Sequence, residues 1–254
     1  GGNLTLGYEL VEDLRTFLTY SLAVVDRGLI GAGRTPPADL FRGGRSSSVR
    51  ASVVYDRRDN RLFPTRGHYQ SVSAEAAHGL LGSQLEFLRL QATTRWYFRL
   101  PWGLVFRVNA QAGWIPSLGD RQVPISERFF LGGIYSVRGY RLRSIGPLRR
   151  VGSDAGGPLT LFSEGGDQEL LLNVELALLE QVGIRGVVFY DAGNAYSEGE
   201  PLFRDSQDRV PLGLFHSVGF GFRWFSPMGP LRFEWGIPLT PRPEYGPLPA
   251  GLLK

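Results

Sequence analysis

Two consecutive stretches decide the fold class: Leu88–Leu100, which reads LRLQATTRWYFRL, and Leu104–Trp114, which reads LVFRVNAQAGW. In the first stretch apolar or small residues occupy every second position, and the positions between them include Arg89, Arg95 and Arg99. The second stretch repeats the alternation. Period two places successive side chains on opposite faces of a strand. Because only Pro101-Trp-Gly103 separates the two stretches, we predict two strands joined by a tight turn, with one apolar and one polar face.

The same alternation recurs along the chain. It is clear in 170–178, 218–224 and 231–237, and less regular in 3–11, 14–27, 46–55 and 68–79. We predict about ten strands of roughly ten residues, the length that a tilted strand needs to cross a bilayer.

The predicted connections alternate between short and long. Short ones fall at 12–13, 101–103, 181–183 and 226–229, and long ones at 28–45, 116–167 and 197–215. Short turns at one rim and long loops at the other are typical of outer-membrane barrels. A soluble β-sandwich is the alternative, but its strands are usually about five or six residues long. The pattern therefore favours an all-β fold, a transmembrane antiparallel β-barrel.

Composition excludes several other classes of protein. The chain has 254 residues, 43% of them hydrophobic, and a net charge of +4, which indicates a folded chain. It contains no cysteine, which excludes disulfide scaffolds, zinc–thiolate sites and thiol nucleophiles. The longest apolar stretch, 169–180, is too short for a membrane helix and contains Glu175. The only lysine is Lys254 and the arginines are scattered, so we expect no nucleic-acid partner.

Chemical motifs are also absent. There is no Gly-x-Ser-x-Gly elbow, no phosphate-binding Gly-x-x-x-x-Gly-Lys loop and no paired-histidine spacing. We therefore expect no enzyme activity, no cofactor and no metal. The first residues lack the features of a signal peptide, so we expect a mature or trimmed piece of a protein.

The long connection contains Glu127-Arg-Phe-Phe-Leu-Gly-Gly133, followed by Ser136-Val-Arg-Gly-Tyr140. This stretch resembles the BamA superfamily of outer-membrane assembly factors, whose hallmark is Val-Arg-Gly-(Phe/Tyr) in an extracellular loop that folds back into the barrel lumen. Three further segments match in order and spacing. They are 55–67 (YDRRDNRLFPTRG), 189–194 (FYDAGN) and 226–233 (SPMGPLRF). The resemblance covers nearly the whole chain.

The resemblance implies a loop latch, Val137, Arg138, Gly139 and Tyr140, in which Arg138 meets the lumen carboxylates Glu175 and Asp191. The residue types agree, because a buried guanidinium needs carboxylate partners and both acids fall on the polar faces of their strands. A solvated loop arginine and ordinary lumen carboxylates are the alternatives. The segment 56–67 is expected to be a structural, periplasmic-side turn. The five tryptophans are expected to lie at the membrane interface.

The chain also departs from the family, whose barrel has sixteen strands behind periplasmic POTRA domains. By the alignment it lacks those domains and the first five strands, and the closing strand is doubtful. We therefore expect residues 1–239 to form a partial barrel, with 116–167 as the long lumen-inserting extracellular loop. Residues 240–254 contain four prolines and are expected to form an irregular tail.

The resemblance implies a protein of the bacterial outer membrane that folds and inserts other barrels without ATP. Its partners would be the outer-membrane bilayer and unfolded outer-membrane protein clients, with POTRA domains and accessory lipoproteins in the full-length protein. Two alternatives remain open: a TamA-like or two-partner-secretion translocator, and the barrel domain of a phospholipase fusion.

Overall fold

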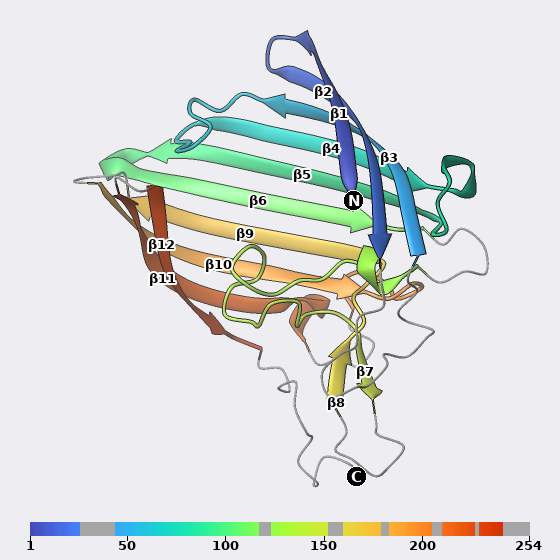
Figure 1. The fold of residues 1–254 in the computed structure, drawn as a ribbon. Coiled ribbons are helices and arrows are strands. Elements are labelled where there is room, and N and C mark those ends of the chain that lie inside the picture. The colour runs from blue at the N-terminus through green and yellow to red at the C-terminus, as the bar shows by residue number, and fades with distance from the viewer. Residues whose placement is uncertain are drawn as a thin grey trace, which may run out of the picture.

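Ten antiparallel strands form one curved sheet, shown in Figure 1. The computed structural model describes residues 1–25, 44–116, 123–151, 160–178, 183–204, 210–226 and 229–240. The strands of the sheet are β1 (Gly2–Val11), β2 (Leu14–Val25), β3 (Gly44–Asp56), β4 (Gly67–Ala77), β5 (Phe87–Leu100), β6 (Leu104–Trp114), β9 (Gln168–Leu178), β10 (Ile184–Tyr196), β11 (Phe215–Ser226) and β12 (Gly229–Pro238).

Each strand pairs with its neighbours in sequence order, except that β6 pairs with β9 across the long loop. The strands contain 10 to 14 residues, long enough to cross a bilayer when tilted. The all-β membrane-sheet fold is thus confirmed, as are about ten strands. Among the described residues β1 and β12 each pair along one edge only, so the sheet is open.

Short elements complete the fold. The long loop carries a small hairpin of β7 (Leu148–Val151) and β8 (Thr160–Ser163), which the sequence does not predict because its strands are four residues long and lack alternation. The described 3-10 turns are η1 (Gly79–Leu81), η2 (Pro101–Gly103), η3 (Ile125–Glu127) and η4 (Pro211–Gly213). No helix in the described part of the chain is long and apolar enough to cross a membrane.

The two faces of the sheet differ as the alternation predicts. On the convex face apolar side chains are exposed, among them Leu4, Val72, Phe98 and Trp235. Aromatic pairs line up across β11 and β12 on this face, with ring centroids 4.9 Å apart for Phe222 and Phe233. The concave face carries the polar and charged residues, so the buried part of the molecule lies inside the curve of the sheet.

The turn between β3 and β4 has the structural role that its composition predicts. The carboxylate of Asp59 accepts hydrogen bonds from the backbone amides of Asn60 (2.9 Å), Thr65 (2.9 Å) and Arg66 (3.1 Å), and from the Thr65 hydroxyl (2.5 Å). Asn60 in turn accepts from the amides of Leu62 and Phe63. One acidic side chain therefore closes the turn.

Some predicted segments lie outside the described residues. These are most of the 28–45 connection, part of the 116–167 loop, and all of the proline-rich tail except Thr240. The division of the chain into a partial barrel, a loop and a tail therefore stays a prediction.

Candidate functional site

The long loop returns along the concave side of the sheet, where Figure 1 shows its green trace in front of β9 and β10. Its two ends are held together by backbone hydrogen bonds, from Ile115 to Asp167 (2.7 Å) and in both directions between Phe129 and Gly166 (2.8 Å each). Phe129 also packs on β6 at Gly113, where an added side-chain carbon would lie 2.6 Å from the Phe129 ring. The absence of a side chain at Gly113 therefore leaves space for Phe129 of the loop against β6.

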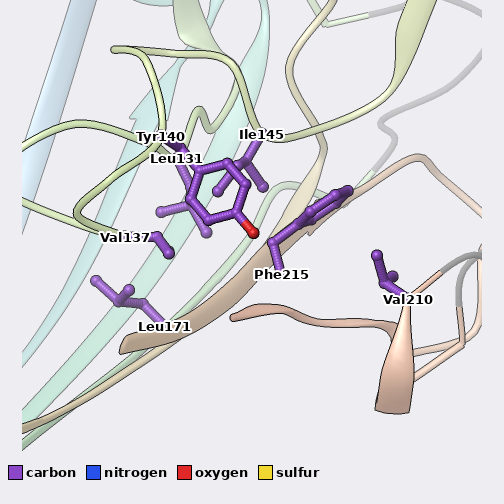
Figure 2. Packing of buried hydrophobic residues seen from close by; sticks show 7 residues of the cluster. All are labelled: Leu131, Val137, Tyr140, Ile145, Leu171, Val210 and Phe215. Atoms are coloured by element: carbon purple, nitrogen blue, oxygen red, sulfur yellow. The ribbon is translucent and has the colours of Figure 1, made fainter. Parts of the chain in front are cut away.

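An apolar cluster supports the tip of the loop (Figure 2). Leu131, Val137, Tyr140 and Ile145 from the loop pack with Leu171 of β9, Phe215 of β11 and Val210. Val137 and Ile145 have no exposed surface. Gly193 of β10 makes room for this cluster, because a side-chain carbon there would lie 3.1 Å from both Leu131 and Val137. Val137, the first residue of the loop latch, thus contributes packing.

Arg138 lies at the centre of three carboxylates. Its Nε and Nη2 donate to the two oxygens of Asp191 at 2.7 Å each, and its backbone amide donates to Asp191 Oδ2 at 3.0 Å. Its Nη1 donates to Glu234 at 2.9 Å and to Glu175 at 3.3 Å. The predicted partners Glu175 and Asp191 are therefore both in contact with Arg138.

Burial makes this contact strong. Asp191 has no exposed surface, and Arg138 is 6% exposed with its guanidinium carbon 3.4 Å from the centre of the Phe189 ring. Burial is the largest influence on the pKa of Arg138 and lowers it, but the hydrogen bonds and charges of Asp191 and Glu234 outweigh it and raise the pKa above its ordinary value. Arg138 is a permanent cation, and removing one partner from such a buried set is costly.

Gly139 and Tyr140 extend the latch to the last two strands of the sheet. Gly139 has a φ of +90° and lies against Gly236 of β12, where a carbon added at Gly236 would come within 2.5 Å of the Gly139 nitrogen. The Tyr140 hydroxyl lies within hydrogen-bond distance of the backbone carbonyls of His216 (2.9 Å) and Thr240 (2.7 Å). The loop latch therefore contacts each of β9, β10, β11 and β12.

More arginines surround the same carboxylates. Glu175 also accepts hydrogen bonds from Arg107 at 2.9 Å and Arg223 at 2.5 Å. Glu234 accepts from Arg223 at 3.0 Å and Arg232 at 2.6 Å. The result is a continuous charged network on the concave face.

A second charged cluster holds the start of the loop. Glu75 of β4 accepts hydrogen bonds from Ser48 (2.7 Å), Arg50 and Arg89 (3.3 Å). Arg89 also donates to the Glu127 carboxylate at 2.6 Å and to its backbone oxygen. Glu127 belongs to η3, so this cluster ties the loop to β3, β4 and β5.

Sequence reasoning missed three partners of the latch: Glu234, Phe189 and Gly236. Glu234 shares the polar face of its strand with Arg232, so the sequence predicts the direction of its side chain but not its contact with Arg138. The positions of Phe189 and Gly236 depend on the curvature of the sheet. Within the described ranges no group of histidine or acidic side chains could hold a metal ion.

A family model described as the Omp85 superfamily domain matches residues 3–247. The outer membrane protein assembly factor BamA of Nitratidesulfovibrio vulgaris is 31% identical over 196 residues, which are 76% of this chain and 23% of that protein. The chain therefore spans about a quarter of the length of this curated relative.

Solved structures share the fold. BamA from Haemophilus ducreyi lacking POTRA domains 1–3 superimposes with a TM-score of 0.73 at 19% identity, covering 94% of this chain and 50% of that one. CdiB from Acinetobacter baumannii gives a TM-score of 0.60 at 17% identity, covering 93% of this chain and 38% of that one. At these identities the two structures show the fold alone.

Proposed function

The chain belongs to the Omp85 superfamily, and from this premise we propose that it forms part of the barrel wall of an outer-membrane protein assembly factor. It is an integral β-barrel protein of the outer membrane, as its relatives in the superfamily are. The similarity to a protein named for outer-membrane assembly supports the assembly role. The shared fold is weaker support, because the CdiB structure has it too.

The proposed activity is the folding and insertion of client barrels without ATP. A client strand would add to an exposed sheet edge through backbone hydrogen bonds, which need no chemical energy source. The proposed partners are the outer-membrane bilayer, unfolded outer-membrane proteins and, in the full-length protein, periplasmic POTRA domains and accessory lipoproteins. No bond-making step belongs to this role.

The loop latch, Val137 to Tyr140, is proposed to keep the barrel wall rigid during insertion. The observation that carries this role is the placement of Arg138 among Asp191, Glu175 and Glu234, on three different strands. A single loop residue thereby ties β9, β10 and β12 together. Such cross-links resist distortion of the sheet when a client pairs with its edge.

The test is the charge reversal Arg138→Glu in the full-length protein, with Arg141→Glu as control because Arg141 is exposed in the same loop. We expect Arg138→Glu to lower the temperature at which the folded band is lost on a gel, and to reduce insertion of an unfolded client barrel into vesicles without nucleotide. The control should do neither.

Each result has a distinct meaning. An unchanged melting temperature would refute the latch. A lowered melting temperature with full client insertion would refute its part in assembly. If the unsubstituted protein transports a client across the vesicle membrane without inserting it, the assembly role itself is wrong and translocation takes its place.

A further inference from the structure

A cavity of about 420 Å³ lies on the concave side of the sheet, between the β3–β4 turn and the tip of the long loop. The turn contributes Arg58, Arg61, Leu62 and Pro64, and the loop tip contributes Ile134 and Tyr135. The volume is in the range of ordinary ligand sites. Because the β3–β4 turn belongs to the rim with short connections, the periplasmic rim of outer-membrane barrels, the cavity lies toward the periplasm.

The walls of this cavity are strongly cationic. Among the residues that the structure describes, seven arginines line it, whereas Glu175 is the only lining carboxylate. Three further carboxylates pair with lining arginines: Asp56 with Arg58, and Asp191 and Glu234 with Arg138. Even when all four carboxylates are counted, the arginines outnumber them by three. An anion is therefore the ligand that the charge favours.

Arg107 of β6 lines this cavity and carries a buried, unpaired donor pair. Its Nη1 donates to Glu175 at 2.9 Å, but its Nε and Nη2 are buried and have no hydrogen-bond partner among the described residues. Buried donors are nearly always paired, so such a group needs an explanation. Nε and Nη2 form one edge of the guanidinium, and Arg138 uses the same edge to hold both oxygens of Asp191.

Neighbouring positive charges raise the free-energy cost of leaving Nε and Nη2 of Arg107 unpaired. Arg185 and Arg223 are close enough to repel it. Arg185, Arg223 and Arg232 also lie directly opposite one another on β10, β11 and β12, an arrangement that destabilises a sheet. A bound anion would relieve this repulsion and pair the free edge at the same time.

The remaining walls favour an anion carried on a polypeptide. Tyr135 is 87% exposed and Leu62 is 80% exposed, and both line the cavity beside the arginines. An inorganic anion would leave these apolar surfaces uncovered, whereas the residues next to a glutamate or aspartate would cover them.

We propose that the cavity binds an acidic polypeptide segment, with one carboxylate on Nε and Nη2 of Arg107 and adjacent apolar side chains on Leu62 and Tyr135. The segment reaches the cavity from the short-turn rim. This binding is separate from the assembly role proposed above, so a failure of client insertion would leave it standing.

The test is isothermal titration of the full-length protein in a neutral detergent with two blocked peptides, Leu-Glu-Leu and Leu-Gln-Leu, and with inorganic phosphate. We expect the glutamate peptide to bind at least about tenfold more tightly than the glutamine peptide, the ratio expected for charge-assisted hydrogen bonds. Phosphate should bind more weakly than the glutamate peptide.

Variants locate the site. Arg107→Gln should abolish the preference for the glutamate peptide, and Arg107→Lys should keep only part of it, because an ammonium keeps the charge but lacks the planar donor pair. Arg99→Gln is the matched control, because exposed Arg99 has the same charge on the neighbouring strand and does not line the cavity. Arg107→Lys also protects the test from misfolding, since Glu175 keeps a cationic neighbour.

Three results would overturn the proposal: equal binding of the two peptides, phosphate binding as tight as that of the glutamate peptide, and an equal loss in Arg99→Gln and Arg107→Gln. Tight phosphate binding would indicate a site for any oxyanion. An equal loss in the two variants would indicate attraction by the overall positive charge and not by Arg107 itself.

Discussion

The long loop is held by two charged clusters that are built in opposite ways. In the latch cluster, a loop cation, Arg138, lies among three wall carboxylates. In the Glu75 cluster, the loop contributes a carboxylate, Glu127, which reaches the wall through Arg89. Both clusters tie the loop to the sheet, but their burial differs.

The difference in burial decides how much each cluster stabilises the protein. Asp191 has no exposed surface and the Glu234 side chain is 2% exposed, so water cannot replace a lost partner in the latch cluster. In the Glu75 cluster the Glu127 side chain is 16% exposed and the Arg50 side chain is 44% exposed, so water reaches more of the groups that a substitution would leave unpaired. The same interaction type should therefore be worth several times more beside Arg138.

The largest expected effect is that of Asp191→Ala. It removes the acceptor of three hydrogen bonds from Arg138 and leaves a buried guanidinium edge unpaired. We expect a loss of about 3–5 kcal/mol in unfolding free energy, measured by urea unfolding in detergent. Asp191→Asn, which keeps the shape, should lose less. A loss below that of Glu75→Ala would contradict the comparison of the two clusters.

Gly236→Ala should have the next largest effect, because the added carbon would come within 2.5 Å of the Gly139 nitrogen and displace the loop tip. We expect a loss of about 1–3 kcal/mol by the same unfolding measurement. Gly186→Ala is the control, since a carbon there meets only the end of the Leu178 side chain at 3.4 Å. Equal effects of the two substitutions would show that the glycine contact is unimportant.

Glu127→Gln probes the weaker cluster. It removes the charge from the 2.6 Å contact with Arg89, while Arg89 keeps Glu75 as a partner. We expect a loss of about 1 kcal/mol, again from urea unfolding. A loss as large as that of Asp191→Ala would mean that both clusters hold the loop equally.

The smallest expected effect is the loss of stability of the β3–β4 turn in acid. Burial raises the pKa of Asp59, but hydrogen bonds from the Thr65 hydroxyl and from the amides of Arg66, Thr65 and Asn60 outweigh it, so the pKa lies below its ordinary value of 3.8. The folded pKa is lower than the unfolded one, so this stabilisation is present above the unfolded pKa and is lost as the pH falls through the folded pKa.

Hydrogen-exchange protection of the Thr65 and Arg66 amides measures this effect. In the unsubstituted protein it should persist from neutral pH down to the ordinary pKa of 3.8 and fall as the pH is lowered further. In Asp59→Asn it should already be low at neutral pH and change little with acid. Protection that persists at acid pH would show that the charge on Asp59 does not close the turn.

The sequence predicts much of the fold because a sheet has a strict period. Alternation in 88–100 and 104–114 determines both the strands and their faces, and the structure agrees. The four-residue strands β7 and β8 offer too few positions for any period to show. Their pairing depends on the path of the loop, which no local pattern specifies.

The candidate site was only partly predictable for the same reason. Period two assigns Glu175 and Asp191 to the polar face, and the resemblance supplies Arg138 as their partner. Which further residues meet Arg138 depends on how far the sheet curves, so Phe189 and Gly236 could not be read from the chain. The unpaired edge of Arg107 is likewise a property of three-dimensional packing, since its sequence neighbours, Phe106 and Val108, resemble those of exposed Arg99.

The strands that receive the latch, β9 to β12, all follow the loop in the chain. If the hairpins form in order from the N-terminus, the loop latch therefore cannot complete its contacts until β12 has formed. Docking of the loop would then follow the formation of β12, with Gly139 and Gly236 meeting only after every intervening turn has formed. The latch would act as a check that the later strands are present and in register.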